Sequence, residues 1–97
     1  MYTMRFDVTC VRECLVNNGR VFTVRTWDGY GVETTVNVLG VGQCKKVRIM
    51  KVSKKEDIAR YIGLSGFNNL DSWWKVINSF GAGNGWLFLV AKVSDCV

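Results

Sequence analysis

The stretch NNGRVFTVRTW carries the side chains of this sequence best suited to hold an anion. Strand alternation places Thr23 and Arg25 on one side, and Arg20 begins the same stretch directly after a turn. A guanidinium beside a hydroxyl can bind a phosphate or carboxylate through paired hydrogen bonds. The alternative is that both arginines are solvated or form ion pairs with nearby acids, Glu13 and Asp28.

A second candidate surface is the segment from residue 45 to residue 60, which has seven basic residues and two acids. It accounts for the whole net charge of +5. A local basic surface concentrates polyanions and favours RNA, DNA or nucleotides as partners. A solvated face is the alternative. The candidates for phosphate contacts are Lys45, Lys46, Arg48 and Lys51.

Aromatic residues near these cations could stack on bases. Trp27 and Tyr30 flank a glycine turn beside Arg25 and are the better candidates, with Trp74 third. The alternative for each is packing in the core, because a short chain needs most of its aromatic residues there.

Enzyme chemistry is restricted by the composition. The chain has no histidine, so Ser-His-Asp and Cys-His arrangements are excluded, and a general base must be a carboxylate, lysine, tyrosine or thiolate. The four cysteines at 10, 14, 44 and 96 form no C-x-x-C pair. We expect buried thiols, with a disulfide as the alternative, and neither a metal nor another cofactor. The GAGNG stretch follows a predicted helix, so it is interpreted as a turn and not as a phosphate loop.

The size and hydropathy of the chain predict a single small domain over residues 1–97. Its hydrophobic fraction is 48% and its charged fraction 22%, which is typical of a soluble globular chain. No apolar run approaches the length of a membrane span, and no signal peptide is visible. We therefore expect an intracellular, cytoplasmic protein without membrane contact.

The elements that must position these side chains follow from periodicity and turn residues. Strands are predicted at 4–8, 20–27, 32–39, 45–52 and 86–93, and helices at 10–17, at 53–62 and from Asn69 or Asp71 to residue 80. The order β-α-β-β-β-α-α-β predicts an α+β fold, a small mixed sheet that closes into a barrel with helices packed on it. The apolar last strand is expected at its centre.

Local signals give finer expectations. Thr9 or Asp7 is expected to cap the first helix, and Gly19 to end it. A capping box from Ser53 to Glu56 is expected to begin the second helix, and Gly63 to end it. Two alternating pairs are expected on opposite faces of the fourth strand, Val47 with Ile49 and Arg48 with Met50. In the third helix, Trp73, Val76, Ile77 and Phe80 form an apolar stripe.

The joint order of several motifs resembles the ASCH family, small relatives of the PUA domain. Members carry a helix and then G-x-K-x-x-T-x-R running into a strand; here Thr23 and Arg25 match, and Arg20 stands at the lysine position. KKVRIMKV, GLSGFNNLDSWWKVI and GWLFLVAKV resemble the family's basic strand, its Gly-Phe segment with a Trp-containing helix, and its final strand. The resemblance implies a PUA-like β-barrel with a cleft between the first signature and the Gly-Phe loop.

Family members are associated with RNA or modified nucleosides, and the leading hypothesis is therefore an RNA- or nucleotide-binding module. Its cleft would be lined by Arg20, Thr23, Arg25, Ser65 and Asn68. The second hypothesis is a small nuclease or an amidohydrolase acting on acylated cytidine. The resemblance then assigns catalytic positions to Arg20, Thr23 and Ser65, with arginine in place of the family lysine and serine in place of its glutamate. These two departures argue against amidohydrolase activity, because an arginine stays protonated and cannot act as a base. Glu13 and Lys51 are spare candidates. The third hypothesis is a protein-interaction scaffold with Trp74 as its anchor.

Overall fold

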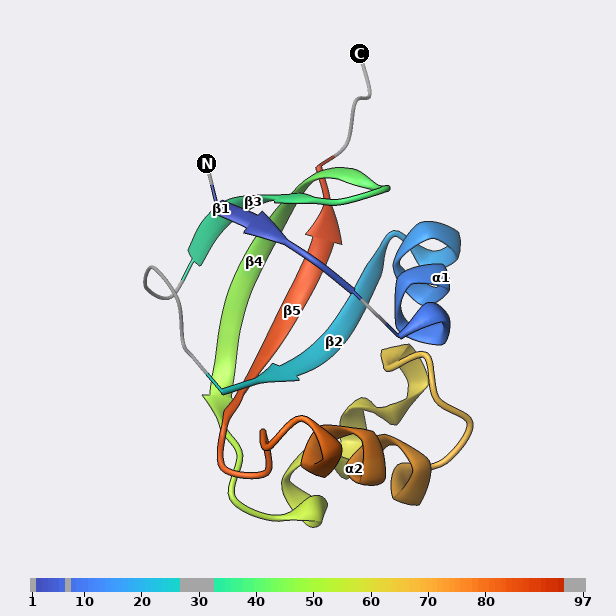
Figure 1. Cartoon of the computed structure of the whole chain (residues 1–97), viewed down its shortest axis with the longest axis vertical. Coiled ribbons are helices and arrows are strands. Elements are labelled where there is room, and N and C mark those ends of the chain that lie inside the picture. Colours follow the sequence, from blue (N-terminus) through green and yellow to red (C-terminus); the bar gives the residue numbers. More distant parts are fainter. Residues whose placement is uncertain (1, 7, 27–32, 94–97) are drawn as a thin grey trace.

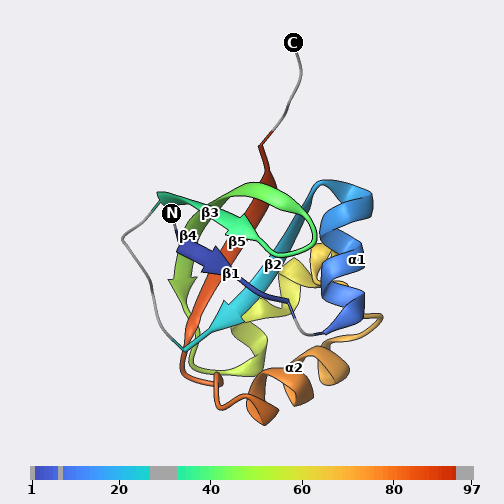
Figure 2. The same cartoon turned by 45° about the horizontal axis from the view of Figure 1, so that its top comes forward.

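Five strands form one curled mixed sheet in the spatial order β1-β3-β4-β5-β2 (Figures 1 and 2). This computed structural model describes residues 2–6, 8–26 and 33–93. The elements in chain order are β1 (Tyr2–Met4), α1 (Thr9–Asn18), β2 (Arg20–Arg25), β3 (Glu33–Val38), β4 (Gly42–Lys51), the 3₁₀ helix η1 (Lys55–Leu64), α2 (Leu70–Ser79) and β5 (Trp86–Lys92). Strand β1 pairs parallel with β3, and the other pairs are antiparallel. The predicted α+β class and element order are confirmed.

The apolar strand β5 lies between β4 and β2, as its composition predicts. Its side chains divide between two faces of the sheet. On the α1 face, Val90 packs in one cluster with Val21 of β2 and Leu15 of α1. On the α2 face, Leu87 packs with Val24 of β2 and with residues of η1 and α2. The predicted alternation along β2 is therefore confirmed.

The first two elements differ from expectation at their boundaries. Strand β1 ends at Met4 and not at Val8, because its parallel pairing with β3 uses only residues 2–4 before the chain leaves for α1. Val8 occupies the N-cap of α1 and its side chain makes no capping hydrogen bond, so the prediction for Thr9 was wrong, while Asp7 lies outside the described residues. Gly19 ends α1 as predicted, with a φ of 79° and an N–H donating to the Leu15 carbonyl at 2.8 Å.

A bulge changes which side chains of β4 face α1. The pairing with β5 shifts between Arg48 and Met50, so Met50 lies opposite Leu87 and packs on the α2 face. The prediction that Arg48 and Met50 share a face was wrong, because the extra residue at a bulge reverses the alternation. Lys51 then lies opposite Trp86, and both are on the face of Arg48.

The second helix is a 3₁₀ helix that begins at Lys55, two residues later than predicted, and continues past Gly63 to Leu64. Because of the later start, Asp57 and not Glu56 is the acid of the capping box. Its carboxylate accepts hydrogen bonds from the backbone N–H groups of Ser53 at 2.9 Å and Lys54 at 3.1 Å. These bonds, first that from Ser53, lower the pKa of Asp57.

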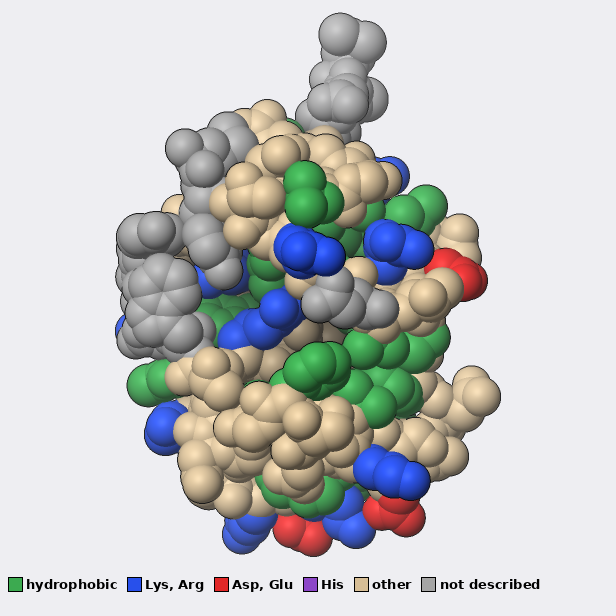
Figure 3. All heavy atoms as spheres, in the orientation of Figure 1, with side chains coloured by type: hydrophobic (Ala, Val, Ile, Leu, Met, Phe, Trp, Pro, Cys, Tyr) green, Lys and Arg blue, Asp and Glu red, His purple; other side chains and the backbone are tan. Residues whose placement is uncertain are grey.

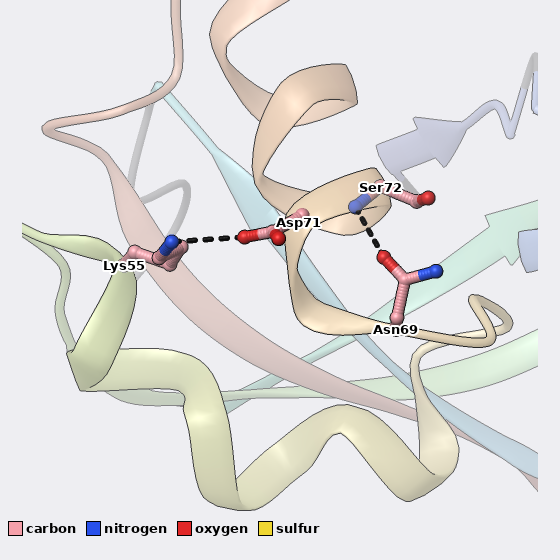
Figure 4. Close-up of polar contacts among 4 residues, drawn as sticks. All are labelled: Lys55, Asn69, Asp71 and Ser72. Carbon is pink, nitrogen blue, oxygen red and sulfur yellow. Dashed lines mark hydrogen bonds and ion pairs between the residues drawn. The ribbon is translucent and has the colours of Figure 1, made fainter.

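The start of α2 is fixed by the two contacts drawn in Figure 4. Asn69 accepts a hydrogen bond from the backbone N–H of Ser72 at 2.8 Å, so of the two predicted starts Asn69 is the cap. Lys55 binds Asp71 at 2.8 Å and ties η1 to α2, and this hydrogen bond raises the pKa of Lys55. Across the described ranges, no helix is both long and apolar enough to cross a membrane.

The far end of α2 departs from the predicted stripe. Trp73 and Ile77 are buried against the sheet, but Phe80 is 62% exposed. The helix ends at Ser79 and Phe80 is its C-cap residue, although the Phe80 N–H still donates to the Val76 carbonyl at 3.3 Å.

Candidate functional site

A cavity of about 340 Å³ lies where the segment after β1, the sheet and α2 meet. Its polar lining comes from Arg5, Thr23, Arg25, Thr26 and Lys46, and its aromatic lining from Phe6, Phe67, Trp73 and Phe80. Figure 3 shows basic side chains gathered across the middle of this face, with hydrophobic side chains beside them. The cavity thus takes its cations from the sheet and from the segment after β1, and has aromatic rings on both sides, Phe6 beside Arg25 and Trp73 and Phe80 from α2 and its C-cap.

Lys46 is the most deeply buried cation of the cavity. Its side chain is 2% exposed, on the α1 face of β4 opposite Val90. Its ammonium lies 4.4 Å from the ring centre of Phe88, a distance typical of a cation–π contact. Lys45 points the other way, is exposed, and binds Glu33 at 3.2 Å. Strand alternation therefore sends one lysine of the pair into the cavity and the other to the surface.

Thr23 and Arg25 reach the cavity from one face of β2, the shared face that strand alternation predicts. Thr23 is 8% exposed and lies opposite Phe88, while Arg25 lies opposite Trp86. The Arg25 guanidinium donates a hydrogen bond to the Arg5 carbonyl at 3.0 Å and lies 4.9 Å from the ring centre of Phe6. Thr23, Arg25 and Lys46 all lie on the α1 face of the sheet, and the register of the strands brings their side chains to the same cavity.

Three other predicted cleft residues lie outside the cavity lining. Arg20 is exposed at the opposite end of β2, where it pairs with Ala91, and Asn68 is exposed in the loop before α2. Ser65 is fully buried, and its hydroxyl donates to the Ile62 carbonyl at 2.8 Å and accepts from the Phe67 N–H at 3.1 Å. The three positions that the resemblance makes catalytic are not brought together, because only Thr23 lines the cavity.

The Gly-Phe loop contributes to the cavity through Phe67. Gly66 has a φ of 88°, and a Cβ there would lie 2.6 Å from the Cys10 carbonyl oxygen. Only glycine adopts this positive φ and allows this close approach of the Cys10 backbone without strain. Gly66 and the buried Ser65 therefore hold the backbone that directs Phe67 into the cavity.

A second basic group adjoins the cavity on the same sheet face. The cations of Arg48 and Lys51 lie 4.9 Å and 5.1 Å from the ring centre of Trp86, and Lys51 also donates to the Asn84 carbonyl at 2.6 Å. Trp86 is the cross-strand neighbour of Arg25. Arg48 and Lys51 therefore continue the basic surface away from the cavity.

The other candidates are placed as follows. Trp74 is half-buried and packs against the α2-face cluster, and Glu13 is exposed on α1 outside the cavity lining. Trp27 and Tyr30, the preferred stacking candidates, lie outside the described residues.

The described cysteines are all free thiols. Cys44 is fully buried, and burial raises the pKa of its thiol, while Cys14 is buried and Cys10 is half-buried. Cys96 lies outside the described residues. Among the residues that the structure describes, no three acidic or thiol side chains come together in a way that could hold a metal ion.

Sequence reasoning missed most of the aromatic lining of the cavity. Phe6, Trp73 and Phe80 all line it, and the pattern assigned the last two to a core stripe. A signal was present for Phe80, since it precedes the helix-ending Gly81 by one residue. No protein-family model, curated protein or solved structure matches this chain.

Proposed function

We propose that this chain is a PUA-like module of the ASCH kind that binds RNA or a nucleotide in the cavity, with a phosphate held at Lys46 and Arg25. The element order and the curled mixed sheet support the proposal. So does the position of Thr23 and Arg25 from the first signature in the same cavity as Phe67 from the Gly-Phe loop. The resemblance to the ASCH family implies that these two segments share one cleft.

The observation that carries the proposal is the burial of Lys46 in the cavity wall. A cation with restricted access to water attracts an anion more strongly than a cation on an open surface. The cavity volume of about 340 Å³ also falls within the range of small-molecule sites, roughly 300–1,000 Å³. Arg25 adds a planar donor suited to phosphate geometry.

The test compares two adjacent lysines of β4 whose side chains point to opposite faces of the sheet. Nucleoside 5′-monophosphates and a short single-stranded RNA are titrated against the wild type, Lys46→Met and Lys45→Met by calorimetry. Lys46→Met should weaken binding about tenfold or more, whereas Lys45→Met should change it less than twofold, because Lys45 faces Glu33 on the surface. Binding should also weaken between about 50 mM and 200 mM salt. Equal effects of the two variants, or affinity independent of salt, would contradict the proposal.

Hydrolysis of RNA or of an acylated nucleoside is the second candidate. It is favoured by one observation, the presence of both Thr23 and Lys46 in the cavity lining, since threonine and lysine are two of the family's catalytic residue types. If N4-acetylcytidine is consumed by the wild type and equally by Thr23→Val, this cavity is not the catalytic site.

A further inference from the structure

Phe80 is a large aromatic side chain at the mouth of the cavity. It is 62% exposed, more than any other large hydrophobic residue that the structure describes as exposed. It also belongs to the cavity lining, together with Trp73 and Val76 of α2. The helical side of the cavity therefore offers an accessible ring, while the sheet side offers cations.

The position of Phe80 is fixed by the backbone that follows it. The Gly81 N–H donates to the Asn78 carbonyl and the Ala82 N–H donates to the Ile77 carbonyl, both at 3.0 Å. Gly81 has a φ of 72°, and these features together form a Schellman motif. Ala82 is 2% exposed and anchors the motif in the core. The backbone that carries Phe80 is therefore held in place before any ligand binds.

We propose that Phe80 is the stacking surface for the base of a nucleoside phosphate whose phosphate lies at Lys46 and Arg25. This inference rests on the proposed function and names its ligand. Charge complementarity assigns the phosphate to the sheet side, and the exposed ring at the opposite side matches a planar base. A simple anion would leave Phe80 without a role in binding. The ligand is either a free nucleotide or one nucleotide of a single-stranded RNA, since both carry the same chemistry.

The experiment separates the base from the phosphate. Adenosine 5′-monophosphate and ribose 5-phosphate, which lacks the base, are titrated against the wild type, Phe80→Ala, Phe80→Leu and Phe80→Trp. Phe80→Ala should weaken binding of the monophosphate about 5- to 100-fold and leave ribose 5-phosphate within twofold. Phe80→Trp should keep the wild-type affinity, and Phe80→Leu should resemble Phe80→Ala. Equal binding of the monophosphate by the wild type, Phe80→Ala and Phe80→Leu would overturn the inference.

A matched control is available on α1. Val16 is 46% exposed and does not line the cavity, so Val16→Ala should bind both compounds as the wild type does. Circular dichroism of each variant shows whether it is folded, and the exposure of Phe80 makes loss of folding unexpected.

Failure of this inference differs from failure of the proposed function. If Lys46→Met weakens the binding of both compounds while Phe80→Ala weakens the binding of neither, the phosphate site is supported and the stacking role is excluded. If the wild type binds neither compound nor a short RNA, both proposals are overturned. A five-nucleotide RNA that binds much more tightly than the monophosphate identifies RNA as the source of the ligand, and equal affinities identify the free nucleotide.

Discussion

The guanidinium of Arg25 donates a hydrogen bond to the backbone carbonyl of Arg5 at 3.0 Å, and this bond joins the two edges of the sheet. Arg25 ends β2, one edge strand, and Arg5 directly follows β1, the other edge strand. The two strands share no ladder, so a side chain helps to close the open side of the half-barrel. The same guanidinium lines the cavity, which couples the integrity of the fold to the site.

Replacement of Arg25 should therefore affect both stability and binding. We expect Arg25→Met to lower the free energy of unfolding by about 2 kcal/mol, because it removes a hydrogen bond from a charged donor. Urea denaturation measures this change. Arg20→Met is the matched control on the same strand, exposed and outside the cavity lining, and should change stability by less than about 0.5 kcal/mol. An equal loss in the two variants would exclude a bridging role for Arg25.

Substitution of Gly66 should be far more damaging than substitution of a nearby glycine. Gly66→Ala places a Cβ 2.6 Å from the Cys10 carbonyl oxygen at a φ of 88°, so we expect a loss of more than about 2 kcal/mol. Gly63→Ala meets no atom within 4 Å and should leave stability unchanged or raise it by up to about 1 kcal/mol. Thermal denaturation of both variants tests the prediction, and similar melting temperatures would contradict it.

Acid should remove the contribution of Asp57 to stability. Its folded-state pKa is lowered by hydrogen bonds from Ser53 and Lys54, so the stabilisation is complete above the ordinary aspartate value of about 3.9 and is lost as the pH falls through the lowered value. Asp57→Asn should thus lower the melting temperature at pH 7, and the difference from wild type should shrink below about pH 4. Glu56→Gln is the control, because the Glu56 side chain has no part in this cap. A difference that is the same at every pH would count against the assignment.

The cysteines should differ in reactivity. Burial raises the pKa of Cys44 and keeps the thiol protonated, whereas Cys10 is half-buried. Only the thiolate reacts with iodoacetamide, so Cys10 should be alkylated well before Cys44 in the folded protein. Mass spectrometry of peptides after short labelling measures both rates, and labelling in urea should remove the difference. Equal rates without denaturant would mean that Cys44 is not buried.

The sequence alone was sufficient to predict those elements whose signals lie in neighbouring residues. Composition placed β5 at the centre of the sheet, turn residues located the end of α1, and the start of α2 was narrowed to Asn69 or Asp71, of which Asn69 is the cap. The alternation that put Thr23 and Arg25 on one face is also a local property.

Other features depend on pairing between distant strands. The bulge that moves Met50 to the α2 face exists only in the register of β4 against β5. The burial of Lys46 likewise depends on the pairing of β4 with β5 and the curl of the sheet, so the sequence could not show which of the two lysines is buried. Ser65 and Arg20 were assigned by motif position, and motif spacing alone does not report which side chains reach a shared cavity.

The central place of β5 sets an order of events during synthesis. Strand β2, which carries Thr23 and Arg25, forms its ladder with β5, and β5 is made after every other strand. While the chain leaves the ribosome, β3 and β4 can form a hairpin early, but β2 must wait until residues 86–92 emerge. The nascent chain should therefore acquire this cavity only in a late, cooperative step, and a ribosome-stalled chain lacking β5 should be sensitive to protease in residues 20–25.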